Sequence, residues 1–242
     1  MKKQISIWML YAGSTVKKLL ALLVLMAAAE AVLFRRAANS LEQTGELWAR
    51  GLDRVFAQSW IPLVFFVIFL LWTAVLLVKS HADAACTLER LQLPGKNILA
   101  IHTCYNILSY LVLLAVQVLV LVGLFRWYGS TVPESIYGPQ SIMLAFYRSE
   151  FLHSLLPLAD WTRYLRTLGV TVGMGLAVAG ASRGMRESQA WVVPVLILAA
   201  ILFFFYPGGM GLRGGDFALG VMFPFVGGVM AWQALADDRE EA

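Results

Sequence analysis

The chain has 242 residues, of which 60% are hydrophobic and 14% are charged, with a formal net charge of +4 at pH 7. A soluble domain of this size would expose too much apolar surface. The basic residues stand at the ends of apolar runs, where they set membrane topology, and this pattern argues against a nucleic-acid-binding protein. The composition therefore predicts an all-α, polytopic membrane protein with a single transmembrane domain over residues 1–242.

Six apolar stretches are each long enough to cross a bilayer, because about 20 helical residues span its roughly 30 Å hydrocarbon core. The lysines would all lie on one side of the membrane if the six helices alternate, and those before the first stretch predict cytoplasmic N- and C-termini. The predicted spans are residues 17–34, 58–79, 98–126, 166–183, 189–206 and 217–236.

The N-terminal segment, residues 4–16, mixes polar and apolar residues. Ile5, Trp8, Met9 and Ala12 share one helical face, which predicts a helix lying in the membrane interface. A simple extension of the first span is the alternative.

Glu30 is the one acid embedded in a predicted span. It stands about one helical turn from Arg35, so one interpretation is a carboxylate that pairs with Arg35 or Arg36 or reaches the headgroup layer. The other interpretation is a role in a substrate path or a proton relay.

The loops on either side of the second span are predicted to contain short helices. In residues 35–57, Ser40 and Gln43 have the spacing of a capping box, and Trp48, Leu52 and Val55 would form an apolar stripe on the helix that follows. In residues 80–97, we expect a helix over 83–93 that is stopped by Pro94 and Gly95; a helical extension of the second span is the alternative.

The third span opens with polar residues that include His102, Tyr105 and Asn106, and Gln117 lies near its middle. Such residues are costly against lipid, so they should face protein or water. Asn106 and Gln117 join Glu30 as candidate substrate-path residues. His102 is interpreted as a hydrogen-bonded polar group, not a metal ligand. In the following loop, residues 140–156 predict a helix that is interfacial or re-entrant.

Small residues recur along one face of the fourth span and would let another helix approach closely, either within the chain or across a dimer. Residues 207–216 predict a flexible, glycine-rich turn without the lysine of a phosphate-binding loop. Pro224, Gly227 and Gly228 predict a kink or break in the last span. The predicted packing residues are Gly169, Gly173, Ala177, Gly180 and Gly184.

Catalytic and metal-binding motifs are missing from the sequence: it has no His-Glu-x-x-His, no Gly-x-Ser-x-Gly and no paired acids within a span. An ion-driven carrier normally has several ionisable groups near the middle of the membrane. We therefore predict that the chain is not an enzyme and that a separate motor drives it. A gradient-driven carrier or an intramembrane enzyme, dependent on Glu30 or His102, is a remaining alternative.

The segment Thr87-Leu-Glu-Arg-Leu-Gln-Leu-Pro-Gly-Lys-Asn-Ile-Leu-Ala100, followed by Tyr105-Asn106 and Leu114-Ala-Val-Gln117, resembles the type-2 (ABC-2) permeases of bacterial ABC exporters. That family includes subunits for antibiotic and lantibiotic export and immunity. The layout of six spans with an N-terminal interfacial segment is also similar. The long outer loop differs in place, because here it follows the third span and not the fifth.

The resemblance implies a permease in the bacterial cytoplasmic membrane that exports a hydrophobic or amphipathic substrate. It implies pairing with a second, identical or related permease, and with ATPase subunits that carry ATP and magnesium. No cofactor is expected on this chain. The alternative is a non-transporting scaffold or sensor subunit. The residues implied to couple to the ATPase are Leu88, Glu89, Arg90, Leu91, Pro94 and Gly95.

Overall fold

The computed structural model describes residues 2–43, 47–65, 70–89, 94–132, 140–156, 160–183 and 213–240. Every regular element in these ranges is a helix, so the all-α prediction is confirmed for this part of the chain. The elements are α1 (Lys2–Gln43), α2 (Leu47–Gln58), α3 (Ile61–Val64), α4 (Leu71–Glu89), α5 (Gly95–Thr131), α6 (Ser141–Arg148), α7 (Glu150–Leu155), α8 (Trp161–Arg183) and α10 (Arg213–Glu240).

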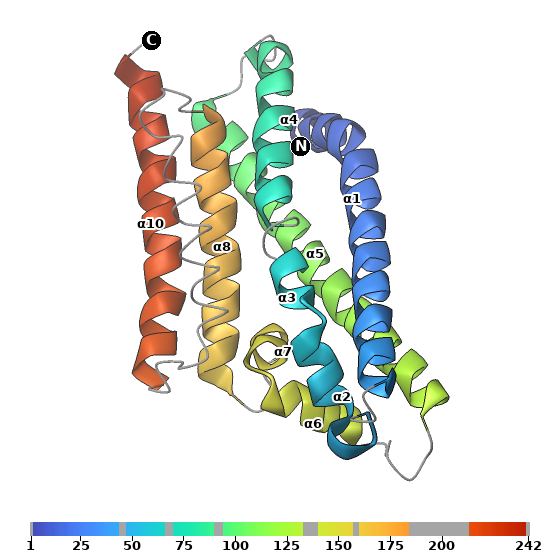
Figure 1. Cartoon of the computed structure of the whole chain (residues 1–242). Coiled ribbons are helices and arrows are strands. Elements are labelled where there is room, and N and C mark those ends of the chain that lie inside the picture. The colour runs from blue at the N-terminus through green and yellow to red at the C-terminus, as the bar shows by residue number, and fades with distance from the viewer. Residues whose placement is uncertain are drawn as a thin grey trace.

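The long helices form an elongated bundle (Figure 1). Helices α8 and α10 lie side by side along one flank, α1 lies on the opposite flank, and α5 crosses obliquely between them. The short helices α2, α6 and α7 gather at one end, called here the short-helix end. The first turns of α1, the end of α4, the start of α5 and the end of α10 lie towards the other end, called here the terminal end.

Within the described residues, three helical segments are long and apolar enough to cross a membrane: Gly95–Thr131, Trp161–Ser182 and Gly215–Ala236. They contain nearly all of the spans predicted over 98–126, 166–183 and 217–236. The predicted span 17–34 lies inside α1, and the span 189–206 lies outside the described residues. These segments give the described chain the helix lengths and composition of a membrane protein.

The predicted span 58–79 is wrong at its start. Helix α2 continues through Gln58, and residues 59–60 separate it from α3. Trp60 has a left-handed backbone, with φ 55° and ψ 10°. This conformation interrupts the right-handed helix, so the chain changes direction between α2 and α3. Pro62 follows within the first turn of α3, where its missing N–H costs no helical hydrogen bond.

Helix α1 is one unbroken helix from Lys2 to Gln43. The N-terminal segment is therefore continuous with the first predicted span, although its first turns bend away from the rest of α1 (Figure 1). The predicted capping box is wrong, because Ser40 lies inside α1 and its hydroxyl donates to the Ala37 carbonyl oxygen at 2.9 Å. Leucine and alanine dominate the middle of α1, and both favour helix.

The short-helix end is held together by aromatic rings. Phe56 of α2 stacks on Phe151 of α7 with centroids 5.9 Å apart, and Phe125 of α5 meets Phe34 of α1 at 6.0 Å and Phe146 of α6 at 5.8 Å. All five rings are buried. Offset and edge-to-face contacts of this kind stabilise packing beyond the area they bury.

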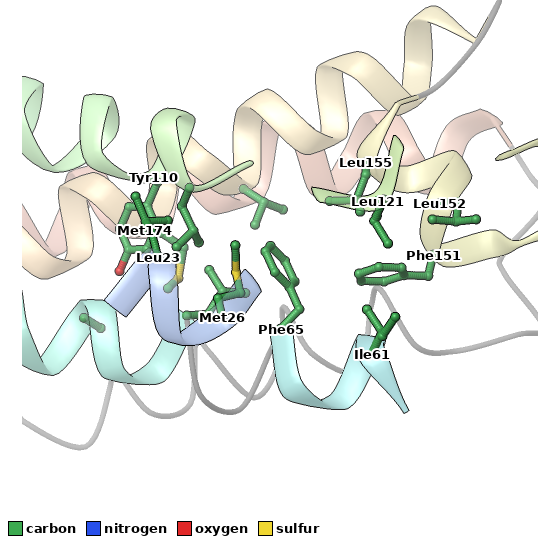
Figure 2. Packing of buried hydrophobic residues seen from close by; sticks show 14 of the residues in the cluster. Leu23, Met26, Ile61, Phe65, Tyr110, Leu121, Phe151, Leu152, Leu155 and Met174 are labelled. Carbon is green, nitrogen blue, oxygen red and sulfur yellow. The ribbon is translucent and has the colours of Figure 1, made fainter. Parts of the chain in front are cut away.

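The same apolar core continues towards the middle of the bundle. Figure 2 shows Phe151 and Leu121 near Ile61 of α3, with Phe65 lying closer to Met26 of α1. The predicted helix before the second span is confirmed as α2, and Leu52 and Val55 on its predicted stripe are buried.

Residues 140–156 form two short helices, not the single helix that was predicted. They break at Ser149, whose hydroxyl oxygen accepts a hydrogen bond from the Leu152 N–H at 3.5 Å. The longer of the two, α6, has eight residues and so rises about 12 Å, too little to cross a bilayer.

Helix α10 begins at Arg213, so the last four residues of the predicted turn 207–216 are helical, while 207–212 lie outside the described residues. Pro224 lies inside this helix without ending it, and the predicted break is wrong. Proline removes the N–H that would bond to the Gly220 carbonyl. That carbonyl instead lies against Gly169 of α8, so packing against α8 supports the helix at this point.

Candidate functional site

The candidate site is a buried acid–amide pair between α1 and α5. Glu30 and Gln117 are both completely buried. Gln117 Nε2 donates to Glu30 Oε2 at 3.1 Å. Among the described residues, Glu30 Oε1 and Gln117 Oε1 have no hydrogen-bond partner. Two of the three predicted substrate-path residues are thus brought together.

The expectation that Glu30 pairs with Arg35 or Arg36, or reaches the headgroup layer, is wrong. Both arginines are exposed, whereas Glu30 lies on the buried face of α1 with Phe34 one turn further on. At about 100° per residue, Arg35 lies some 140° around the helix from Glu30. The acid therefore points into the bundle.

Asn106, the third predicted substrate-path residue, is separate from this pair. It precedes Gln117 by eleven residues of α5, which is about 16 Å along the helix. Its Nδ2 donates to the Gly175 carbonyl oxygen of α8 at 3.3 Å, and it is completely buried. Asn106 therefore joins α5 to α8.

A second polar cluster, called here the N-terminal clamp, consists of Tyr11, Thr15, His102 and Tyr105. The Tyr11 hydroxyl is hydrogen-bonded to His102 Nε2, and the Thr15 hydroxyl to the Tyr105 hydroxyl. All four side chains are buried. This confirms the prediction that the polar start of the third span faces protein, and the bond to His102 agrees with its interpretation as a hydrogen-bonded polar group.

The face of α1 that packs on the protein is a different face from the apolar one that was predicted to lie in the membrane interface. Ile7, Tyr11 and Thr15, four residues apart, are completely buried, whereas Met9 is 70% exposed. The burial of Tyr11 and Thr15 was not predicted, because only apolar residues were used to define a helical face. Their spacing of four residues nevertheless places them on one face of a helix.

Four of the six residues implied to couple to an ATPase lie at the end of α4 and the start of α5, at the terminal end of the bundle (Figure 1). Leu88 and Glu89 form the end of α4, Pro94 is the N-cap of α5 and Gly95 its first residue. Arg90 and Leu91 lie outside the described residues, and α4 continues through 83–89 without a separate helix. The prediction of an isolated helix from Asp83 is therefore wrong.

The small-residue stripe of α8 packs against α10 of the same chain. A β-carbon on Gly173 would lie 2.5 Å from the Phe223 carbonyl oxygen, and one on Gly180 would lie 3.0 Å from the Met230 carbonyl. Gly169 and Ala177 are also buried. The internal-packing alternative is thus the one observed for these positions, and Gly184 lies outside the described residues.

A buried ion pair links the starts of α8 and α10. Arg166 Nη1 donates to Asp216 Oδ1 at 2.8 Å, and Nη2 donates to the Ser154 hydroxyl of α7 at 2.6 Å. Asp216 also lies in the first turn of α10, where the helix dipole favours a negative charge. The sequence analysis did not predict this ion pair. The signal for it was the presence of two opposite charges near the starts of two apolar helices.

No protein-family model, curated protein or solved structure matches this chain. Among the described residues, no group of three or more histidine, cysteine or acidic side chains could hold a metal ion. In the Glu30–Gln117 pair, one oxygen of each side chain has unused hydrogen-bonding capacity among the described residues.

Proposed function

We propose that the chain is the transmembrane permease subunit of an ABC exporter, with six spans, and that it moves a hydrophobic or amphipathic substrate. In this proposal it resides in a bacterial cytoplasmic membrane with both termini in the cytoplasm. It pairs with a second permease, and separate subunits bind ATP and magnesium and hydrolyse the ATP.

The observation that carries the proposal is the arrangement of the terminal end. The end of α4 and the start of α5, which carry most of the segment that resembles the coupling region, lie at the same end of the bundle as the first turns of α1 (Figure 1). A motor subunit docked there would touch both elements at once.

The N-terminal clamp supports the same proposal. It fixes the first turns of α1 on α5 at His102 and Tyr105, about two to three helical turns after Pro94. A force applied at the α4–α5 connection would therefore reach both α1 and the long oblique helix α5. In the proposal, this force tilts the helices and opens a path for the substrate.

The proposal is tested by purifying the full chain from its native membrane in mild detergent. We expect a protein with a Walker A motif to co-purify, and ATP turnover that rises with substrate after reconstitution. Charge reversal in Glu89→Lys should return turnover towards its basal rate, because Glu89 ends α4 at the proposed docking point.

The control for this variant is Glu42→Lys, a charge reversal on an exposed side chain near the opposite end of α1, which should leave turnover unchanged. A stable complex without coupled ATP turnover would instead identify a scaffold or sensor subunit. Transport by the purified chain alone would contradict the proposal.

A further inference from the structure

The Glu30–Gln117 pair has a mismatch between donors and acceptors. An ionised carboxylate has only acceptors, and the amide supplies the only N–H groups of the pair. One amide N–H bonds to Glu30 Oε2. With Glu30 ionised, Glu30 Oε1 and Gln117 Oε1 would both remain buried acceptors without a donor among the described residues, a costly state.

One proton removes the mismatch. If Glu30 Oε1 carries a proton, it becomes a donor, and Gln117 Oε1 is the acceptor of the pair that still needs one. The two groups then form the reciprocal pair of a carboxylic acid and a primary amide, in which each gives and receives one hydrogen bond. We propose that Glu30 and Gln117 form a proton-binding site, in which Glu30 is held as a neutral acid by the Gln117 amide.

The apolar surroundings of the pair favour a proton as its ligand. One helical turn away on either side, α1 carries Met26 and Phe34 and α5 carries Leu113 and Leu121, and all four are completely buried. A bare carboxylate in such surroundings is strongly disfavoured.

Larger cations fit the contact poorly. Both polar side chains have no exposed surface, so the described structure leaves no opening for a hydrated ion. The nearest basic residues along α1, Arg35 and Arg36, are exposed on its other face. Among the described residues, no further acidic, histidine or cysteine side chains gather with Glu30 to bind a metal.

The proposal stands whether or not the chain is a permease. It changes what Glu30 can do, because a neutral acid holds α1 on α5 without placing a charge in the apolar layer. In a transport cycle, α1 and α5 could then move apart without exposing an ion to lipid. Glu30 could attract a cationic substrate only after releasing its proton.

Infrared spectroscopy of the full chain in lipid nanodiscs near neutral pH tests the proposal, since a protonated carboxyl has a C=O stretch at higher frequency than a carboxylate. We expect a protonated-carboxyl band that disappears in Glu30→Gln. The band should persist in Glu42→Gln, which changes an exposed glutamate of the same helix. A native spectrum without a Glu30-dependent protonated band would overturn the proposal.

Thermal unfolding gives a second, independent test. Glu30→Gln replaces the acid by an amide that can still give and receive one hydrogen bond, so its unfolding midpoint should match that of the native chain. Gln117→Leu removes both bonds and should unfold at a lower temperature, with its carboxyl band shifted to that of an unbonded acid. If Glu30→Gln unfolds as early as Gln117→Leu, the acid is needed in its charged form and the proposal is wrong.

Discussion

The carbonyl oxygen of Gly220 in α10 lies against Gly169 in α8, so close that a β-carbon on Gly169 would overlap it. Pro224, four residues after Gly220, has no N–H to offer this carbonyl. The Gly220 carbonyl therefore lacks the usual hydrogen bond within α10. Because α8 approaches closely, the Gly169 Cα–H can instead make a weak C–H···O contact with it, of a kind that recurs at helix interfaces. Glycine at position 169 thus permits a close contact with the carbonyl that Pro224 leaves without a helical hydrogen bond.

Gly169→Ala should therefore destabilise the fold. Its methyl group would meet backbone, not a movable side chain, so we expect a loss of about 2 kcal/mol or more in the free energy of unfolding. The measurement is chemical or thermal unfolding in detergent. Gly123→Ala is the matched control, since nothing lies within 4 Å of its β-carbon, and it should gain about 0.5–1 kcal/mol from helix propensity. Equal effects of the two variants would contradict the close α8–α10 contact.

Removing one member of the Arg166–Asp216 pair should be costly. Asp216→Asn removes the carboxylate charge next to the Arg166 guanidinium, whose side chain is 8% exposed, and we expect a loss of about 3 kcal/mol in the free energy of unfolding. Replacing both residues, in Arg166→Met with Asp216→Leu, should recover part of this loss, because both charges of the pair are then removed. Unfolding curves of the three variants provide the measurement.

The control for this pair is Arg148 with Asp53, which are 2.9 Å apart but 66% and 29% exposed. Arg148→Met should cost only about 0–1 kcal/mol, since solvent screens an exposed pair. A similar loss in the free energy of unfolding at both pairs would show that the burial of Arg166 does not determine how much its ion pair stabilises the fold.

Breaking the N-terminal clamp should loosen the first turns of α1 without unfolding the bundle. Tyr11→Phe and Tyr105→Phe each remove one buried hydrogen bond, which costs about 1 kcal/mol. We expect faster amide hydrogen exchange over residues 6–15 and unchanged exchange over residues 19–43. Tyr147→Phe, at a side chain that is 68% exposed, should leave both regions unchanged. Uniform acceleration along α1 would argue against a local clamp.

The left-handed backbone at Trp60 predicts an unusual order of stability between two substitutions. Both Trp60→Ala and Trp60→Gly remove the exposed indole, but only glycine adopts a φ of 55° without strain. The glycine variant should therefore be more stable than the alanine variant by about 1 kcal/mol. Thermal unfolding of the pair measures this difference, and the usual order, with alanine more stable, would show that residue 60 does not hold this backbone.

Much of the fold follows from local sequence patterns. The apolar runs of α5, α8 and α10 are long enough to be recognised singly. The apolar stripe of α2 and the spacing of small residues in α8 are also local, because residues three and four apart share a helical face. The predicted ends of the helices were less accurate, and α1 and α5 extend further than expected. The length of an apolar run indicates how much of a helix can lie in the hydrocarbon core, but it does not show where the helix ends.

The sequence alone determined that the described chain is helical, that it has apolar segments long enough to cross a membrane and that the polar start of the third of the predicted spans faces protein. Only the tertiary structure decided that Glu30 turns to Gln117 and away from Arg35, that Gly169 meets Gly220, and that Arg166 pairs with Asp216. The physical reason is that periodicity fixes which residues share a face of one helix. The partner of that face depends on which helices lie side by side and on how each is rotated and shifted, and these are set by the packing of the whole bundle.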